Sequence, residues 1–155
     1  MNKTLICYFS ATGTTKKVAE KMSSIINGDL FEIEPVEAYT EKDLDWMDKT
    51  SRSSIEMNDS NSRPAIKNKV NNLNDYDKVI IGFPVWWYIA PKIINTFIEE
   101  NDLSGKSIYV FVTSGSSSVT SSYNNLKKDY PNLNFVNSKR FTGSESAEEF
   151  TNWLD

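Results

Sequence analysis

The sequence predicts an α/β domain, in which a mainly parallel sheet carries helices on both faces. Two observations predict this class: five short runs of β-branched and aromatic residues, and polar stretches of helical period between them. The chain has 155 residues, the usual size of one domain. Because a chain of this length buries well over half of its surface, we expect one domain over residues 1–155 that folds without disulfides.

The first strand and helix follow from apolar patterning. Residues 5–9 are continuously apolar, which is typical of a central strand covered on both faces. Residues 14–26 carry one stripe of apolar side chains at helical spacing, and Asn27-Gly28 ends the helix. A short second strand is predicted at 30–33.

The second half repeats this alternation. Residues 79–83 and 108–112 are apolar runs predicted as strands, and 135–136 is a weak fifth strand. The helix predicted at 90–99 has Pro91 in its first turn, where the missing N–H breaks no helical hydrogen bond. Two further helices are predicted at 119–128 and 147–154.

The segment from Pro35 to Asn74 is too long for a bare loop in a compact domain. Thr40 and Asp43, followed by apolar residues, predict a capped helix of two or three turns there. The rest of the segment, through Ser62, has the composition of a loop. Residues 29–59 hold ten acidic and three basic side chains, either an acidic patch for a basic partner or a solvated surface.

Composition excludes several classes of function. The net charge of −4 has the wrong sign for a nucleic-acid partner. There is no histidine, which excludes imidazole bases, histidine metal sites and Ser-His-Asp triads. The one cysteine, Cys7, cannot form an intramolecular disulfide. Since no signal peptide or membrane-length apolar run is present, we expect a cytoplasmic protein with no membrane partner.

Three loops that follow predicted strands form the candidate ligand site. They span residues 10–15, 84–88 and 113–118, and none contains an acidic residue. In open α/β sheets, ligands bind beyond the carboxyl ends of the strands, where the strand order reverses. We therefore expect these loops to lie together and to tolerate an anion.

The first loop is typical of a phosphate site. It places four hydroxyls and a flexible glycine just before a helix: Ser10, Thr12, Gly13, Thr14 and Thr15. The N–H groups and dipole at a helix N-terminus attract anions without a buried Lys or Arg. The alternative is an ordinary helix cap, for which one hydroxyl suffices.

Three other phosphate-handling motifs do not fit the spacing. Gly105-Lys106-Ser107 matches the end of a Walker A loop, but it precedes a strand. A cysteine-dependent phosphatase needs an arginine six residues after its cysteine, where Gly13 follows Cys7. Because Cys7 lies within a predicted strand, we expect a buried apolar role for it. A response-regulator receiver needs acidic residues where this chain has Ser10 and Pro84.

The other two loops suit a flat heterocycle. The second groups three aromatic side chains, Trp86, Trp87 and Tyr88, which either stack on a planar ligand, fill the core or bind a partner. The third offers hydroxyls and a glycine, and could bring backbone N–H groups to a polar ring edge. A phosphate site, a planar-ring site and a polar edge together predict a flavin mononucleotide (FMN) site.

These residues resemble flavodoxins, in particular short bacterial flavodoxin-like proteins with a Trp-Trp pair after the third strand. The resemblance rests on the segments 8–19, 63–66, 75–77, 82–87 and 113–116, which come in the family's order. It implies a single-domain, three-layer α/β/α sandwich, with a five-stranded parallel sheet in the order 2-1-3-4-5. FMN would then lie over strands 1, 3 and 4.

Carried over by position, the resemblance implies three sets of cofactor-binding residues. The FMN phosphate would contact Ser10, Thr12, Gly13, Thr14 and Thr15. The isoalloxazine would be lined by Pro84, Val85, Trp86 and Trp87, with Tyr88 able to cover it. The pyrimidine edge would face Ser114, Gly115, Ser116, Ser117 and Ser118. No residue is assigned a catalytic or metal-binding role.

The leading hypothesis is an electron carrier that binds FMN and shuttles electrons between a reductase and an acceptor, as a monomer. One alternative is an FMN-dependent NAD(P)H:quinone-type oxidoreductase, usually a dimer. Another is a flavin-free module that binds proteins through the aromatic loop. Tyr88 stands where such proteins often have glycine, and its bulk resists positive φ, so we expect weak stabilisation of one-electron-reduced flavin.

Overall fold

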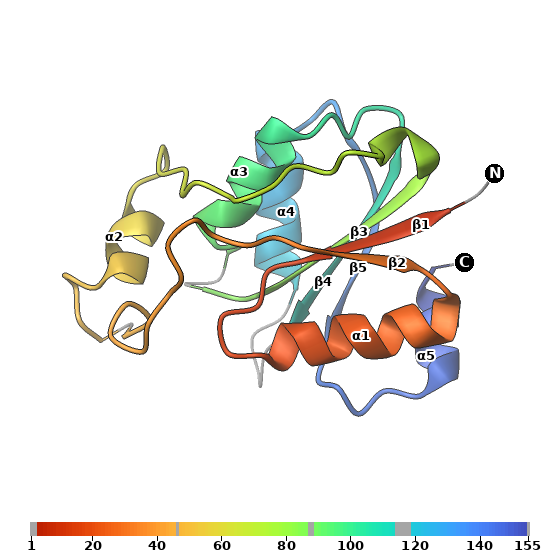
Figure 1. The fold of residues 1–155 in the computed structure, drawn as a ribbon, viewed down its shortest axis with the longest axis horizontal. Coiled ribbons are helices and arrows are strands. Elements are labelled where there is room, and N and C mark those ends of the chain that lie inside the picture. Colours follow the sequence, from red (N-terminus) through yellow and green to blue (C-terminus); the bar gives the residue numbers. More distant parts are fainter. Residues whose placement is uncertain (1–2, 46, 87–88, 114–118, 155) are drawn as a thin grey trace.

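A five-stranded parallel sheet in the order β2-β1-β3-β4-β5 organises the protein (Figure 1). The computed structural model describes residues 3–45, 47–86, 89–113 and 119–154. All neighbouring strands run parallel, which confirms the predicted class and strand order. The strands are β1 (Thr4–Tyr8), β2 (Asp29–Glu32), β3 (Lys78–Pro84), β4 (Ser107–Thr113) and β5 (Asn134–Phe141).

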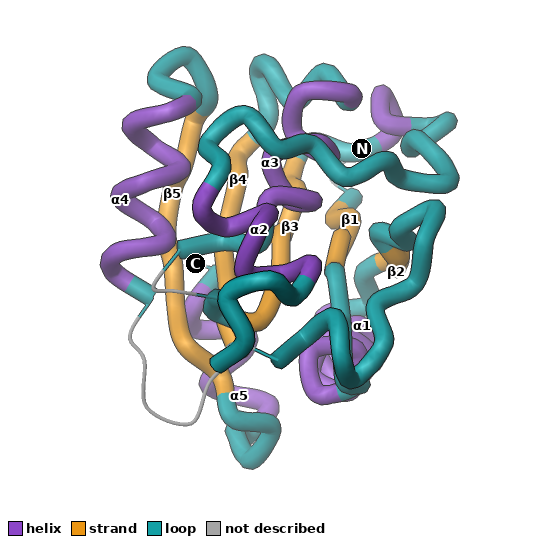
Figure 2. Tube along the Cα trace, turned by 90° about the vertical axis from the view of Figure 1, so that its left-hand side faces the viewer, coloured by secondary structure: helices purple, strands orange, loops and turns teal. Residues whose placement is uncertain are grey.

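Helices cover both faces of this sheet. Figure 1 shows α1 and α5 on one face, and α3 and α4 on the other. A short helix, α2, lies apart from these layers, beyond the carboxyl ends of the strands (Figures 1 and 2). The helices are α1 (Thr14–Ile26), α2 (Arg52–Asn58), α3 (Lys92–Glu100), α4 (Thr120–Asp129) and α5 (Ala147–Trp153), with a 3₁₀ turn at Leu73–Asp75.

Alternating side chains of the strands divide the core into two halves. In β1 and the residue after it, Leu5, Cys7 and Phe9 pack with α3, whereas Ile6 and Tyr8 pack with α1 and α5. Because both faces are covered, the central strands are apolar throughout. Cys7 is fully buried, and burial raises the pKa of its thiol well above the usual value. Its predicted apolar role is therefore confirmed.

A glycine in β3 allows a close contact with the neighbouring strand. A Cβ added at Gly82 would lie 2.0 Å from the ring of Phe111 in β4. That separation is far below van der Waals contact, so the Phe111 ring occupies the space that a side chain at position 82 would need.

The helix predicted after Thr40 is absent from the described residues, and a helix lies later in the segment. The predicted capping bonds do form, since the amide N–H of Thr40 donates to Asp43 Oδ2 (3.0 Å) and that of Asp43 to Thr40 Oγ1 (3.1 Å). The chain then continues in turns, because the Asp45 and Asp48 carboxylates accept backbone N–H groups two residues on.

The observed helix is α2, in a stretch predicted to be loop. Its buried residues are all polar: Ser53, Ser54 and Glu56. It therefore lacks the apolar stripe from which helices are predicted. Ser51 caps its N-terminus by accepting the N–H of Ser54.

The fifth strand is longer than predicted. β5 spans Asn134–Phe141, whereas the sequence indicated only 135–136. It is an edge strand held by pairing with β4, and most of its side chains are exposed or half-buried, so it has no apolar run. The other predicted strands and helices differ from the observed ones only near their ends.

Two absences hold for the part of the chain that the structure describes. None of its helices is both long and apolar enough to cross a membrane. Nor do three or more Asp, Glu or Cys side chains there gather in a way that would hold a metal ion.

Candidate functional site

The predicted loops begin at adjoining strand ends, as expected. The amide N–H of Phe9, just after β1, donates to the carbonyl of Gly82 in β3 (3.0 Å). Thr15, in the first turn of α1, and Thr113, at the end of β4, share a buried hydroxyl–hydroxyl bond of 2.7 Å. Residues of the site that lie outside the described part of the chain are Trp87, Tyr88, Ser114, Gly115, Ser116, Ser117 and Ser118.

The N-terminus of α1 is open to a ligand. Gly13 is its N-cap, with a left-handed φ of 98°, and no side chain of the described residues caps the helix. The first helical hydrogen bond runs from the N–H of Lys17 to the carbonyl of Gly13 (3.1 Å). The N–H groups of the first turn come before this bond and so have no partner within the helix. With no acidic residue in that turn, this end of the helix suits an anion.

The four hydroxyls of the first loop have different environments. Ser10 Oγ accepts the N–H of Gly13 (3.0 Å) and so shapes the turn. Thr12 and Thr14 are exposed. Thr15 is buried, and its hydroxyl binds Thr113. Of these hydroxyls, therefore, the structure exposes Thr12 and Thr14 to a ligand and gives Ser10 and Thr15 bonds within the protein.

In the second loop, Trp86 packs inward on two aromatic rings. Its ring centroid lies 5.7 Å from that of Phe9 and 5.3 Å from that of Tyr39, both in edge-to-face geometry. Phe9 and Tyr39 also touch each other, with centroids 5.6 Å apart. Trp86 and Ile89 exchange backbone N–H···O=C bonds of 3.0 Å. The half-buried Trp86 indole thus packs against two of the chain's own aromatic rings.

Two residues of α2 hold Tyr39 in this cluster. The Tyr39 hydroxyl donates to Glu56 Oε1 (2.5 Å), and Glu56 Oε2 accepts from Arg52 Nε (2.9 Å). The Arg52 guanidinium carbon lies 3.8 Å from the centre of the Tyr39 ring. Burial and the hydrogen bond to Glu56 raise the pKa of Tyr39 far above its usual value, so the phenol stays protonated and donates.

Sequence reasoning did not select Phe9, Tyr39, Arg52 or Glu56 for the site. Phe9 was assigned to a strand, and the other three lie in the long segment between β2 and β3. No sequence motif marks them, because their association depends on how that segment folds back over the strand ends.

A cavity of about 190 Å³ lies beside the first loop. Glu34 in this cavity forms an ion pair with Lys67 at 3.4 Å, and Glu32 also lines the cavity. These carboxylates oppose a phosphate on this side of the loop. The cavity is lined by Phe9, Ser10, Ala11, Glu32, Glu34, Pro35, Ala38, Tyr39 and Lys67.

A larger cavity, of about 580 Å³, lies at the other end of the sheet. It is formed where α3 and α4 end, by the residues that lead into β4 and β5. It contains none of the predicted site residues.

Comparison with known proteins identifies the family. The flavodoxin family model matches residues 3–155. The chain belongs to the flavodoxin family. The predicted resemblance is thereby confirmed, and the sheet order of this flavodoxin is the one that the resemblance implied. No curated protein matches the chain.

Solved structures of similar proteins extend the comparison. A candidate flavoprotein from Bacteroides eggerthii is 50% identical over 100% of this chain and 97% of that one, with a TM-score of 0.97. One from Bacteroides uniformis is 47% identical over 99% and 97%, with a TM-score of 0.93. A flavoprotein from Lactobacillus acidophilus, crystallised in complex with FMN, is 26% identical over 100% of both chains, with a TM-score of 0.76.

Proposed function

We propose that this flavodoxin binds FMN non-covalently and carries electrons between a reductase and an acceptor. The observation that carries the proposal is the uncapped N-terminus of α1, next to hydroxyl-rich, acid-free loops and the aromatic cluster around Trp86. Family membership and the Lactobacillus acidophilus relative crystallised with FMN support the same cofactor.

The residues present fit an FMN phosphate. Beyond its two chain neighbours, no atom of the described residues lies within 4 Å of the position of a Cβ at Gly13, so these residues leave the space above the turn open. The exposed Thr12 and Thr14 hydroxyls and the N–H groups of the α1 first turn would supply the donors. Ser10 and Thr15 would maintain the shape of the loop through their bonds to Gly13 and Thr113.

The second loop would hold the ring system. Because Trp86 packs on Phe9 and Tyr39, we assign the stacking role to Trp87, and Pro84 and Val85 would form the rest of the wall. Tyr88 and residues 114–118 keep their predicted roles at the ring and its pyrimidine edge. Bound FMN would supply the redox chemistry, and the protein would bind and orient it.

The carrier role is favoured over substrate chemistry by the side chains available. The chain has no histidine, and its one thiol is buried. The acidic excess over residues 29–59 suits basic redox partners, and we expect a monomer. The cytoplasmic location also stays a prediction.

The test is titration of the flavin-free protein with FMN, riboflavin and FAD, followed by flavin absorbance and fluorescence. We expect one-to-one FMN binding with quenched fluorescence, and weaker binding of riboflavin, which lacks the phosphate. Equal affinity for FMN and riboflavin would contradict the phosphate site at α1. No flavin binding would reject the proposal and leave the aromatic loop as a partner surface.

The reductase alternative is tested with the same preparation. Rapid oxidation of NADH or NADPH by the FMN-loaded protein with a quinone acceptor would identify an enzyme. We expect no such turnover from a carrier unless a separate reductase is added.

A further inference from the structure

We propose that Arg52 is a positioning residue of the flavin site: it holds Tyr39 against Trp86 and so orders the second loop, which would line the isoalloxazine. The part of this inference that concerns the flavin rests on the proposed function. The part that concerns the order of Trp86 does not.

The contacts of Arg52 hold its guanidinium from three directions. Nε donates to Glu56 Oε2 at 2.9 Å, and Nη1 donates to the carbonyl of Glu37 at 2.7 Å. The guanidinium carbon lies 3.8 Å from the centre of the Tyr39 ring. Only 21% of the side chain is exposed, so the cation–π contact is shielded from water. A lysine could not reproduce this planar set of donors.

Glu56 couples Arg52 to Tyr39. Its two carboxylate oxygens accept separately, Oε1 from the Tyr39 hydroxyl and Oε2 from Arg52. The side chain of Glu56 is only 11% exposed. Loss of Arg52 would leave this carboxylate without its cation, which is costly for a mostly buried charge.

Tyr39 transmits this restraint to the second loop. With its hydroxyl held by Glu56 and one face covered by Arg52, the ring meets Trp86 at 79° with centroids 5.3 Å apart. Trp86 in turn exchanges two backbone hydrogen bonds with Ile89. The order of the second loop at Trp86 therefore depends on Arg52 through Tyr39 and Glu56.

The helix that carries Arg52 is held by polar contacts: the N–H of Ser53 donates to the carbonyl of Asp43 (2.9 Å), and the hydroxyl of its N-cap, Ser51, donates to the carbonyl of Asp45 (2.7 Å). The buried residues of α2 are polar, and Ile55 is 57% exposed. A helix without an apolar face gains little from burial. The Arg52–Glu56–Tyr39 contact thus provides a specific attachment of α2 to the strand ends.

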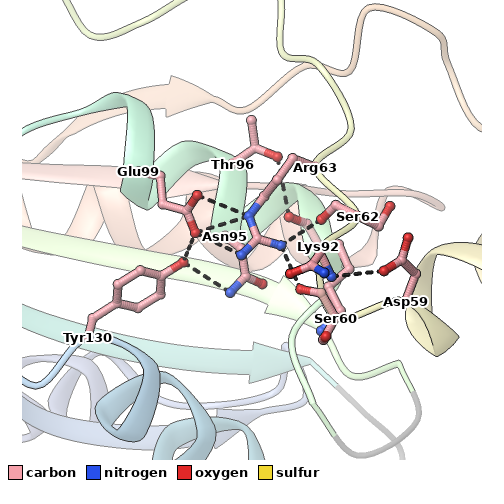
Figure 3. A network of polar contacts seen from close by, with 10 residues as sticks. Asp59, Ser60, Ser62, Arg63, Lys92, Asn95, Thr96, Glu99 and Tyr130 are labelled. Atoms are coloured by element: carbon pink, nitrogen blue, oxygen red, sulfur yellow. Dashed lines mark hydrogen bonds and ion pairs between the residues drawn. The ribbon is translucent and has the colours of Figure 1, made fainter.

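Arg63 offers a matched control (Figure 3). Its Nε donates to Glu99 Oε1 of α3 at 3.0 Å, and its Nη2 forms an ion pair with Glu99 Oε2 at 2.9 Å. Its Nη1 donates to the carbonyls of Ser60 and Ser62. It too is an arginine with a carboxylate and backbone acceptors. Among the described residues, the cation–π contact with Tyr39 is made by Arg52 and not by Arg63.

The experiment compares Arg52→Met, Arg52→Lys and Arg63→Met with the wild type. Amide hydrogen exchange of Trp86 and Ile89 is measured in the flavin-free protein. The dissociation constant for FMN and the visible absorption and circular dichroism of the bound flavin are measured in the loaded protein. These spectra respond to the surroundings of the ring, which a general loss of stability does not change.

We expect Arg52→Met to speed exchange at both amides and to weaken FMN binding, each by roughly tenfold, the scale of one shielded cation–π contact. The flavin bands should shift. Arg52→Lys should fall between Arg52→Met and the wild type, and it serves as the test variant if Arg52→Met does not fold. Arg63→Met should keep both exchange rates, the FMN affinity and the flavin bands close to wild-type values.

Equal behaviour of Arg52→Met and Arg63→Met in exchange and in the flavin spectra would overturn the inference. Faster exchange in Arg52→Met, with no FMN binding by any variant, would reject the proposed function and support the positioning of Trp86. Unchanged exchange in Arg52→Met, together with normal FMN binding, would support the proposed function and reject the positioning of Trp86 by Arg52.

Discussion

The hydroxyl of Thr15, in the first turn of α1, lies 2.7 Å from the hydroxyl of Thr113 at the end of β4. Both residues are buried, and 98 positions separate them in the sequence. This bond joins the end of the first loop to the start of the third. The two loops proposed for opposite ends of FMN are therefore tied together inside the protein.

Replacing Thr113 by Val should lower the free energy of unfolding by about 1 to 3 kcal/mol, because the buried Thr15 hydroxyl loses its partner. Urea unfolding measures the loss. In the Thr15→Val, Thr113→Val double variant both hydroxyls are gone, so the combined loss should be smaller than the sum of the single losses. Simple additivity would show that the bond contributes nothing of its own.

Replacing Gly13 by Ala should weaken FMN binding through the backbone of the α1 N-cap. Gly105 is a matched control, because both glycines have positive φ (98° and 77°) and, in the part of the chain that the structure describes, neither has an atom beyond its chain neighbours within 4 Å of a Cβ position. Each Gly→Ala change should lower stability by about 1 to 2 kcal/mol, the cost of a left-handed alanine. Only Gly13→Ala should raise the FMN dissociation constant. An equal rise in Gly105→Ala would contradict a local role for Gly13.

Replacing Trp87 by Ala should weaken FMN binding by about 1 to 3 kcal/mol, the scale of a buried aromatic contact. The control is Trp86→Phe, which keeps an aromatic ring against Phe9 and Tyr39 and should retain most of the FMN affinity. Flavin fluorescence titration of both variants distinguishes the two indoles. A larger loss of affinity in Trp86→Phe than in Trp87→Ala would reverse the assignment.

The Arg63–Glu99 pair predicts a pH dependence of stability. The hydrogen bond from Arg63 holds the pKa of Glu99 below its usual value, and the Tyr130 hydroxyl donates to the same carboxylate at 2.5 Å. A lowered pKa in the folded state stabilises the protein above the unfolded pKa of about 4.3, and this stabilisation is lost as pH falls through the folded pKa.

Urea unfolding of the wild type and Glu99→Gln from neutral pH to pH values below the pKa of Glu99 tests this prediction. The stability difference between the two proteins should shrink as the carboxylate is protonated. Because the Glu99 side chain is 41% exposed, the effect should be small and should decrease with added salt. A difference that stays constant with pH would contradict it.

The sequence was most informative where burial is uniform. The runs at 5–9, 79–83 and 108–112 correspond to β1, β3 and β4, because strands covered on both faces must be apolar at every position. Asn27 ends α1 in the left-handed conformation that its position predicted, with a φ of 58°.

The sequence was least informative where structure depends on a neighbour. β5 is held by its pairing with β4 and needs no apolar run, so only two of its residues were predicted. α2 buries polar side chains and therefore shows no apolar stripe in the sequence. At Thr40 the predicted capping bonds with Asp43 form, but no helix follows them among the described residues. Neither outcome is encoded in a periodic pattern.

By itself, the sequence determined the fold class, the order of the strands through its family motifs, and the acid-free loops with Gly13 before α1. These features are local in the chain or repeat with a fixed period. Only the tertiary structure decided that Thr15 binds Thr113, that Trp86 packs inward, and that Arg52 and Glu56 hold Tyr39 beside it. Such contacts join residues from separate segments, and they exist only because burial of the sheet brings the strand ends and the 36–58 segment together.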